Sequence, residues 1–130
     1  MAHSGQVIAG QGGFRLHLLR VDPEVLELEA SSTQAMPPPP AHFHPRQDER
    51  FEVLEGTVWT RIGDVERTYE AGDRFDVPAG TSHQVSAQGA ARMHWEIRPA
   101  LRTAEFFERL YGGQAGEGFL EEFADEIRLT

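Results

Sequence analysis

The sequence lacks cysteine altogether, which excludes a disulfide framework and removes thiolates from the possible metal ligands. It also lacks an excess of positive charge, since 12 lysine and arginine residues stand against 21 aspartate and glutamate residues, for a net charge of −9. Phosphate groups bind to basic surfaces, so this balance argues against nucleic acid and anionic membranes as partners. No apolar run approaches the ~20 residues of a membrane-spanning helix. Residues 1–13 also lack the charged-then-apolar pattern of a signal peptide. We therefore expect a cytoplasmic protein.

The composition that is present suits one globular domain. A chain of 130 residues can bury a core, and its hydrophobic content of 39% is ordinary for such domains. Residues 1–13 are rich in glycine and are predicted to be partly loose, although 6–9 could form a short strand beside a neighbouring strand or a partner chain. No internal repeat is visible. We predict a single domain over residues 1–130.

Most of the chain before Pro99 reads as short strands. Segments rich in valine, phenylalanine, threonine and tyrosine alternate with glycine-containing turns, among them a hairpin turn at 63–64. The proline run 37–40 cannot form a central strand because proline donates no hydrogen bond, so it is predicted to be an extended edge segment that leads into the next strand. The last strand is predicted at 91–98. Short strands at this spacing are typical of an antiparallel barrel or sandwich.

The pattern changes after Pro99, where two helices are predicted within residues 103–127. Thr103 is a plausible N-cap of the first helix, which should end at Gly112. A stripe at helical spacing predicts the second helix, and it consists of Phe119, Leu120, Phe123 and Ile127. We expect these helices to cap one end of the barrel or to brace a dimer.

The centre of the sequence holds two histidines followed by a glutamate. His42 and His44 are two residues apart, so in an extended strand their side chains share a face with Cα atoms roughly 6.5 Å apart. After a turn, Glu49 begins an alternating run in which it shares a face with Phe51 and Val53. Imidazoles and a carboxylate from neighbouring strands can bind one metal ion. The pattern therefore predicts a metal site on two paired strands.

A second stretch, from Gly72 to His83, supplies another histidine. Pro78 presets φ and Gly80 permits a positive φ, so the segment between them is predicted to turn. His83 then lies near the start of the following strand, with Val85 on its face.

Together the two stretches resemble the paired motifs of the cupin superfamily. The first runs from His42 to Gly56 and the second from Gly72 to His83, with fifteen residues between the two motif glycines as in compact members. The second motif usually ends in asparagine, which is not a metal ligand, and this chain has Ala87 at that position. The resemblance implies an all-β fold, an antiparallel double-stranded β-helix or jelly-roll barrel, and often a homodimer. It also implies a divalent metal ion bound by His42, His44, Glu49 and His83.

The residues do not decide which metal ion would bind. Imidazole suits Fe, Ni, Zn and Cu, and a carboxylate also admits Mn. Three histidines and one carboxylate in an octahedral site leave two positions for water, substrate or dioxygen.

Several nearby residues compete for roles in the site. Gln47, Asp48 and Glu52 are alternative oxygen donors, but Glu49 has the favourable phase. His94 shares a face with Glu96, opposite the apolar face of its strand. If the apolar face fills the barrel, which burial statistics favour, His94 is exterior; if the barrel mouth is polar, His94 is a candidate acid–base catalyst.

Three other aromatic or histidine positions need separate interpretations. Trp59 is expected in the core or at an interface rather than stacked on a substrate, and His3 and His17 are expected at the surface.

Three classes of function are compatible with this sequence. The first is a metal-dependent enzyme, an oxygenase with Fe or an isomerase with Mn, Zn or Ni, acting on a small organic molecule. The second is a non-catalytic module that binds a small ligand. The third, ranked last, is an interaction protein with a vestigial site. The fold hosts many reactions, so the resemblance names none of them.

Overall fold

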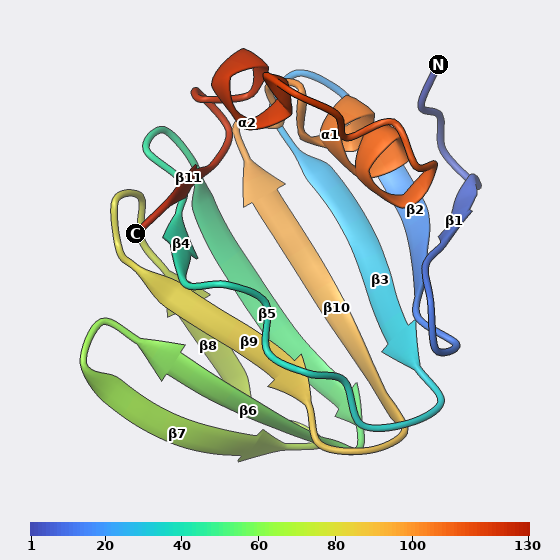
Figure 1. Cartoon of the computed structure of the whole chain (residues 1–130). Coiled ribbons are helices and arrows are strands. Elements are labelled where there is room, and N and C mark those ends of the chain that lie inside the picture. Colours follow the sequence, from blue (N-terminus) through green and yellow to red (C-terminus); the bar gives the residue numbers. More distant parts are fainter.

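The computed structural model describes residues 1–130 and contains two antiparallel sheets that curve around a common interior (Figure 1). The first sheet has the order β1-β2-β3-β10-β5-β8 and the second β11-β4-β9-β6-β7. This arrangement confirms the predicted antiparallel jelly-roll barrel. The strands are β1 Val7–Ala9, β2 Arg15–Val21, β3 Leu26–Ser32, β4 His42–Phe43, β5 Asp48–Glu55, β6 Thr57–Ile62, β7 Val65–Glu70, β8 Arg74–Val77, β9 His83–Ala87, β10 Ala91–Arg98 and β11 Arg128–Leu129.

Period-two alternation decides which face of each strand fills the barrel. On β10, Trp95 lies opposite Leu28 of β3 and Phe51 of β5, and Leu28 and Phe51 are buried. Neighbouring residues on β10 therefore point outward, and His94 is among them. The interior contains two apolar clusters, one beneath the helices and one around Phe51 and Val53.

The two helices cover the open end of the first sheet, near β2 and β3 (Figure 1). Helix α1 spans Thr103–Tyr111 and α2 spans Phe119–Glu122. Four buried phenylalanines attach them to the larger cluster: Phe106, Phe107, Phe119 and Phe123. Burial of these rings explains why short helices persist here, since a helix of this length has little stability alone.

Two details of the helical prediction were wrong. The N-cap is Arg102, and Thr103 is the first helical residue. The hydroxyl of Thr103 accepts a hydrogen bond from the side chain of Gln47 instead of capping the helix. The second helix ends at Glu122 and does not continue to 127. Beyond it the chain turns back, and β11 pairs with β4, so tertiary pairing overrides the helical periodicity.

Two segments near the histidines have structures that their residue types explain. The proline run lies along β9, where the N–H of Met36 donates to the carbonyl of Ala87 and the amide of Gln84 donates to that of Pro39. Gly56 has a φ of 79°, and a Cβ there would lie 2.3 Å from the carbonyl oxygen of Ala90, so only glycine fits.

The N-terminal segment contributes β1, which pairs with β2 of the same chain. None of the helices has the length and apolar content needed to span a bilayer.

Candidate metal centre

Three histidines converge on the inner face of the second sheet. Strand β4 pairs with β9 so that His42 lies opposite His83, and His44 follows two residues later. One ring nitrogen from each of the three lies within 4.8 Å of the others. The spacing predicted from the sequence therefore brings these imidazoles together, and the group could hold a metal ion.

Backbone carbonyls fix the orientation of all three rings. The Nδ1 atoms of His42, His44 and His83 lie 2.8, 2.7 and 2.9 Å from the carbonyl oxygens of Pro40, Glu126 and Thr81, respectively. A carbonyl only accepts, so each Nδ1 must carry the proton and donate it. In the neutral imidazole this leaves Nε2 as a lone-pair donor. Metal-binding histidines typically have this tautomer and this kind of partner.

Glu49 faces the same point from β5. Its Oε1 lies 3.0 Å from the Nε2 of His44 and 3.0 Å from the Nε2 of His83. Its Oε2 accepts a hydrogen bond of 2.8 Å from the indole N–H of Trp95. The carboxylate is therefore oriented with one oxygen held by Trp95 and the other directed at the histidines.

The contact between His44 and Glu49 leaves two buried atoms without a hydrogen bond. Although they are 3.0 Å apart, the Nε2 of His44 and the Oε1 of Glu49 lack a hydrogen-bond partner. With Nδ1 protonated, a neutral His44 directs a lone pair at a carboxylate oxygen, which is repulsive. A proton or a cation between them removes that repulsion. The donor set and these two unpaired atoms thus fit a bound metal ion.

The protonation states suit the same role. Burial lowers the pKa of His42 to about 4, so this ring is neutral at pH 7. Burial alone would raise the pKa of Glu49, but His44 and His83 outweigh it and lower the pKa to about 2. Burial also disfavours the charged form of His44, yet the neighbouring Glu49 carboxylate raises its pKa above the usual value. A metal ion must therefore displace a proton from His44 more than from His42.

The surroundings of the four side chains are apolar. In the strand register, Glu49 lies between Val77 and Ile97, and His83 lies opposite Ile62. Glu49 is only 2% exposed. An ionised carboxylate so deeply buried is costly unless it is paired with a cation or donors. Trp95 supplies one donor to Glu49, and a proton on His44 or a metal ion would supply the second partner.

The competing oxygen donors lie elsewhere. Gln47 is buried, but its amide donates to Pro99, Ala100 and Thr103. Asp48 points outward and accepts the N–H of Ala79, and Glu52 pairs with Arg74.

Residues that could have lined the barrel mouth also point outward. His94 contacts Glu27 at 2.8 Å on the outer face, so the exterior interpretation of this residue is confirmed. The indole N–H of Trp59 donates to Glu66 on the exposed side of β6, so Trp59 is neither in the core nor at the site. His17 is exposed, as predicted.

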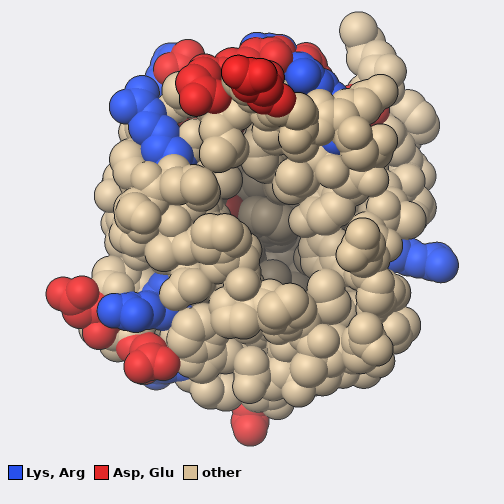
Figure 2. Space-filling view, viewed as in Figure 1, with Lys and Arg blue, Asp and Glu red and all other residues tan.

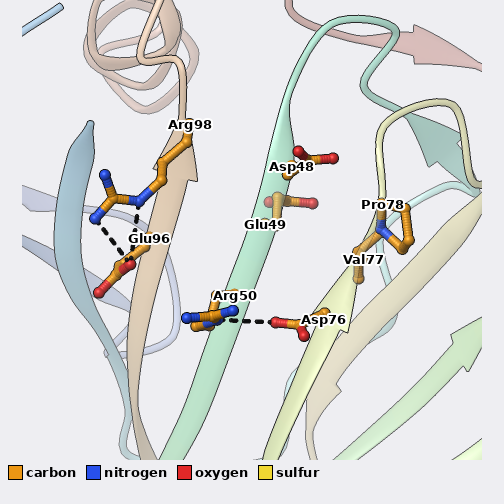
Figure 3. Close-up of a pocket in the computed structure, with 8 residues that line it drawn as sticks. All are labelled: Asp48, Glu49, Arg50, Asp76, Val77, Pro78, Glu96 and Arg98. Carbon is orange, nitrogen blue, oxygen red and sulfur yellow. Dashed lines mark hydrogen bonds and ion pairs between the residues drawn. The ribbon is translucent and has the colours of Figure 1, made fainter. Parts of the chain in front are cut away.

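The outer face of β5 carries a charged groove rather than a second site. Figure 3 shows this groove, in which Arg50 pairs with Asp76 at 3.1 Å and Arg98 with Glu96 at 3.3 Å. The charges of these exposed residues are paired with one another. Glu49 is on the same strand, but its carboxylate lies on the inner face of the sheet.

Sequence reasoning missed two contributors to the centre. Trp95 belongs to the apolar face of its strand, which was expected to fill the barrel, but its hydrogen bond to Glu49 depends on cross-strand register. Glu126 lies 82 residues from His44, and its backbone carbonyl orients that ring. No side-chain pattern could reveal a main-chain contact made by a tail that crosses over β4.

Comparison with known proteins agrees with this architecture. The family model described as "Cupin domain" matches residues 32–97. An RmlC-like cupin from Shewanella frigidimarina has a TM-score of 0.69 at 20% identity, covering 76% of this chain and 87% of that one. KdgF from Halomonas sp. has a TM-score of 0.65 at 18% identity, covering 72% and 86%.

A third similar structure is Pac13, a nucleoside dehydratase from Streptomyces. Its TM-score is 0.59 at 19% identity, covering 72% of this chain and 75% of that one, and variants of it have been solved with uridine. No curated protein sequence matches this chain. At such identities the solved structures establish the fold alone, whereas the family model spans half of the sequence. On the matched segment, the paired motifs and the barrel, this chain belongs to the cupin family.

Proposed function

We propose that this cupin binds a divalent metal ion through His42, His44, Glu49 and His83, and that the ion binds a small organic molecule in the barrel. The observation that carries the proposal is the set of three imidazoles whose Nδ1 atoms contact backbone carbonyls while Nε2 atoms and the Oε1 of Glu49 face a common point. Structural histidines satisfied by the protein alone would have no need for this arrangement.

When bound, such an ion acts as a Lewis acid or, if it is iron, supports dioxygen chemistry. The chain's own residues orient and insulate the centre. Trp95 holds Glu49, Glu126 holds His44, and the apolar neighbours of the four donors limit access of water. These roles are the same whether the reaction is an oxygenation or an isomerisation.

Of the two reaction types, we favour the oxygenase. An isomerase moves a proton with a side chain placed beside the substrate. The candidate for that task, His94, lies on the outer face, and the inner-face neighbours of the donors are valine, isoleucine and tryptophan. The same observation supports the second candidate function, a module that binds a ligand without transforming it.

Metal analysis of protein purified without chelator tests the proposal. We expect close to one Fe, Mn, Ni or Zn ion per chain after loading, and little in a His83→Ala variant. Protein that stays free of metal after incubation with each of these ions would contradict the proposal. Consumption of a substrate in the presence of dioxygen, lost with His44→Ala, distinguishes an oxygenase from a binding module.

A homodimer and a cytoplasmic location stay predictions. Sedimentation that gives a monomer at micromolar concentration would contradict the first.

A further inference from the structure

We propose that the barrel takes a small molecule with one negative charge and an apolar body, for example a 2-oxo acid with an alkyl tail. It should discriminate against ligands with a second negative charge and against ligands with several hydroxyl groups. This inference rests on the proposed function, because the negative group of the molecule would bind at the metal centre.

No positive side chain is buried in the interior of the barrel. The chain has no lysine, and none of its arginines is buried. Arg50, Arg92 and Arg98 lie on the outer face of the first sheet, each paired with a carboxylate. Arg67 lies opposite Thr60, on the same face of β7 as Tyr69, but β7 is the edge strand of the second sheet, and Arg67 is exposed there over the ring of Tyr69.

The surface view agrees with this distribution. Figure 2 shows a hollow near the centre of the face, and the atoms around its mouth belong to uncharged residues, while arginines and acidic residues lie towards the edges. A second anionic group on a ligand would therefore have no buried cation to pair with inside the barrel.

The inner wall of the barrel is mainly apolar. The partly exposed inner-face side chains that pack against the cores include Ile62, Val85, Met93 and Trp95, and Tyr69 on the edge strand β7 adds one hydroxyl group. The indole N–H of Trp95 is already donated to Glu49, and the hydroxyl of Thr60 is donated to the carbonyl of Arg67. A ligand with several hydroxyl groups, such as a nucleoside, would lose hydrogen bonds to water without regaining them.

The net charge of the metal centre favours a ligand with one negative group. A divalent ion with three neutral imidazoles and the carboxylate of Glu49 has a net charge of +1. One negative group on the ligand neutralises it. A second would be buried without a partner, which we expect to weaken binding about a hundredfold.

Isothermal titration of the metal-loaded protein with three probes tests the inference. The first two, 4-methyl-2-oxopentanoate and 2-oxoglutarate, share the same metal-binding group and differ in the charge of the tail; the third is uridine. We expect the alkyl 2-oxo acid to bind at least about tenfold more tightly than either of the others. Equal or tighter binding of 2-oxoglutarate or uridine, or no binding of any probe, would overturn the inference.

A matched pair of variants sharpens the test. Met93→Arg places a cation on the inner wall and should raise the affinity for 2-oxoglutarate relative to the alkyl acid. Thr68→Arg adds the same charge to the exposed outer face of β7 and should leave the ratio unchanged. If both variants change the ratio equally, the discrimination comes from overall charge and the inference fails. If Met93→Arg does not fold, the comparison of probes on the unmodified protein still decides.

Metal content, measured first, separates this inference from the proposed function. Protein that binds no metal removes both, whereas metal-loaded protein that prefers the dicarboxylate removes only the ligand class.

Discussion

Two clusters of histidine and carboxylate lie one inside and one outside the barrel, and their spacing alone does not distinguish them. The inner cluster contains His42, His44 and His83 beside Glu49; the outer one contains Glu27, His94 and Glu96. In both the histidine trio inside and the Glu–His–Glu trio outside, the potential ligand atoms lie within 4.8 Å of one another.

The clusters differ in whether their atoms already have partners. Outside, the ring of His94 contacts Glu27 at 2.8 Å and Arg98 pairs with Glu96, all partly exposed to water. Inside, the buried Nε2 of His44 and Oε1 of Glu49 have no hydrogen-bond partner, and Glu49 forms no ion pair with an arginine. We infer that buried ligand atoms without a hydrogen-bond partner indicate a metal site better than ligand spacing does.

The largest expected effect is the loss of a ligand from the inner cluster. We expect His44→Ala to weaken metal binding by more than the about 10–100-fold typical of outer-shell substitutions. The control is His94→Ala, which should leave metal content unchanged because its cluster is satisfied without an ion. Competition with a chromophoric chelator measures both constants. Equal losses in the two variants would remove the distinction between the clusters.

Replacing Glu49 with glutamine is expected to have the next largest effect. Glu49→Gln keeps the shape and an acceptor for Trp95 but removes the negative charge, so metal affinity should fall by roughly a hundredfold. In the metal-free protein, the pKa of His44 should fall because the carboxylate that raises it is gone. NMR titration of the imidazole measures this shift, and an unchanged pKa would show that Glu49 is not its cause.

Trp95 should affect the centre only through Glu49. We expect Trp95→Phe to weaken metal binding about tenfold, since the carboxylate loses the donor that orients it. The matched control is Trp59→Phe, which removes an equivalent hydrogen bond to Glu66 on the outer face. Metal affinity reduced equally in both variants would indicate general destabilisation instead of positioning.

Lowering the pH by one unit should reduce metal affinity less than any of these substitutions. The pKa of His44 is raised, so a proton competes increasingly with the metal as the pH falls, and affinity should fall by less than about tenfold per pH unit. In the metal-free protein, protonated His44 contributes stability below pH 6.5, and this contribution disappears as the pH rises through its raised pKa.

His42 and Glu49 shift in the other direction. The pKa of His42 is lowered to about 4, so stability falls as the pH drops from 6.5 towards 4; the pKa of Glu49 is lowered to about 2, so its contribution persists until far lower pH. Melting temperatures of the metal-free protein measured from pH 8 to pH 2 test these directions. Metal affinity that rises on acidification would contradict the assigned protonation states.

The sequence was sufficient to predict the barrel and the convergence of His42, His44, Glu49 and His83. Alternation on β10 predicted both its bounds and the outward direction of His94, because a half-buried strand repeats every two residues. It was insufficient at the C-terminus, where helical periodicity continues past Glu122 while the chain leaves the helix to pair with β4. The contact between the carbonyl of Glu126 and His44 arises from that pairing, so no local pattern encodes it.

The most direct test is the location of the ion in crystals of metal-loaded protein. An anomalous difference map collected at the absorption edge of the metal should show one peak, on the inner face between the Nε2 atoms of His42, His44 and His83 and the Oε1 of Glu49. A peak at Glu27, His94 and Glu96 instead, or none at the inner cluster at full loading, would contradict the account.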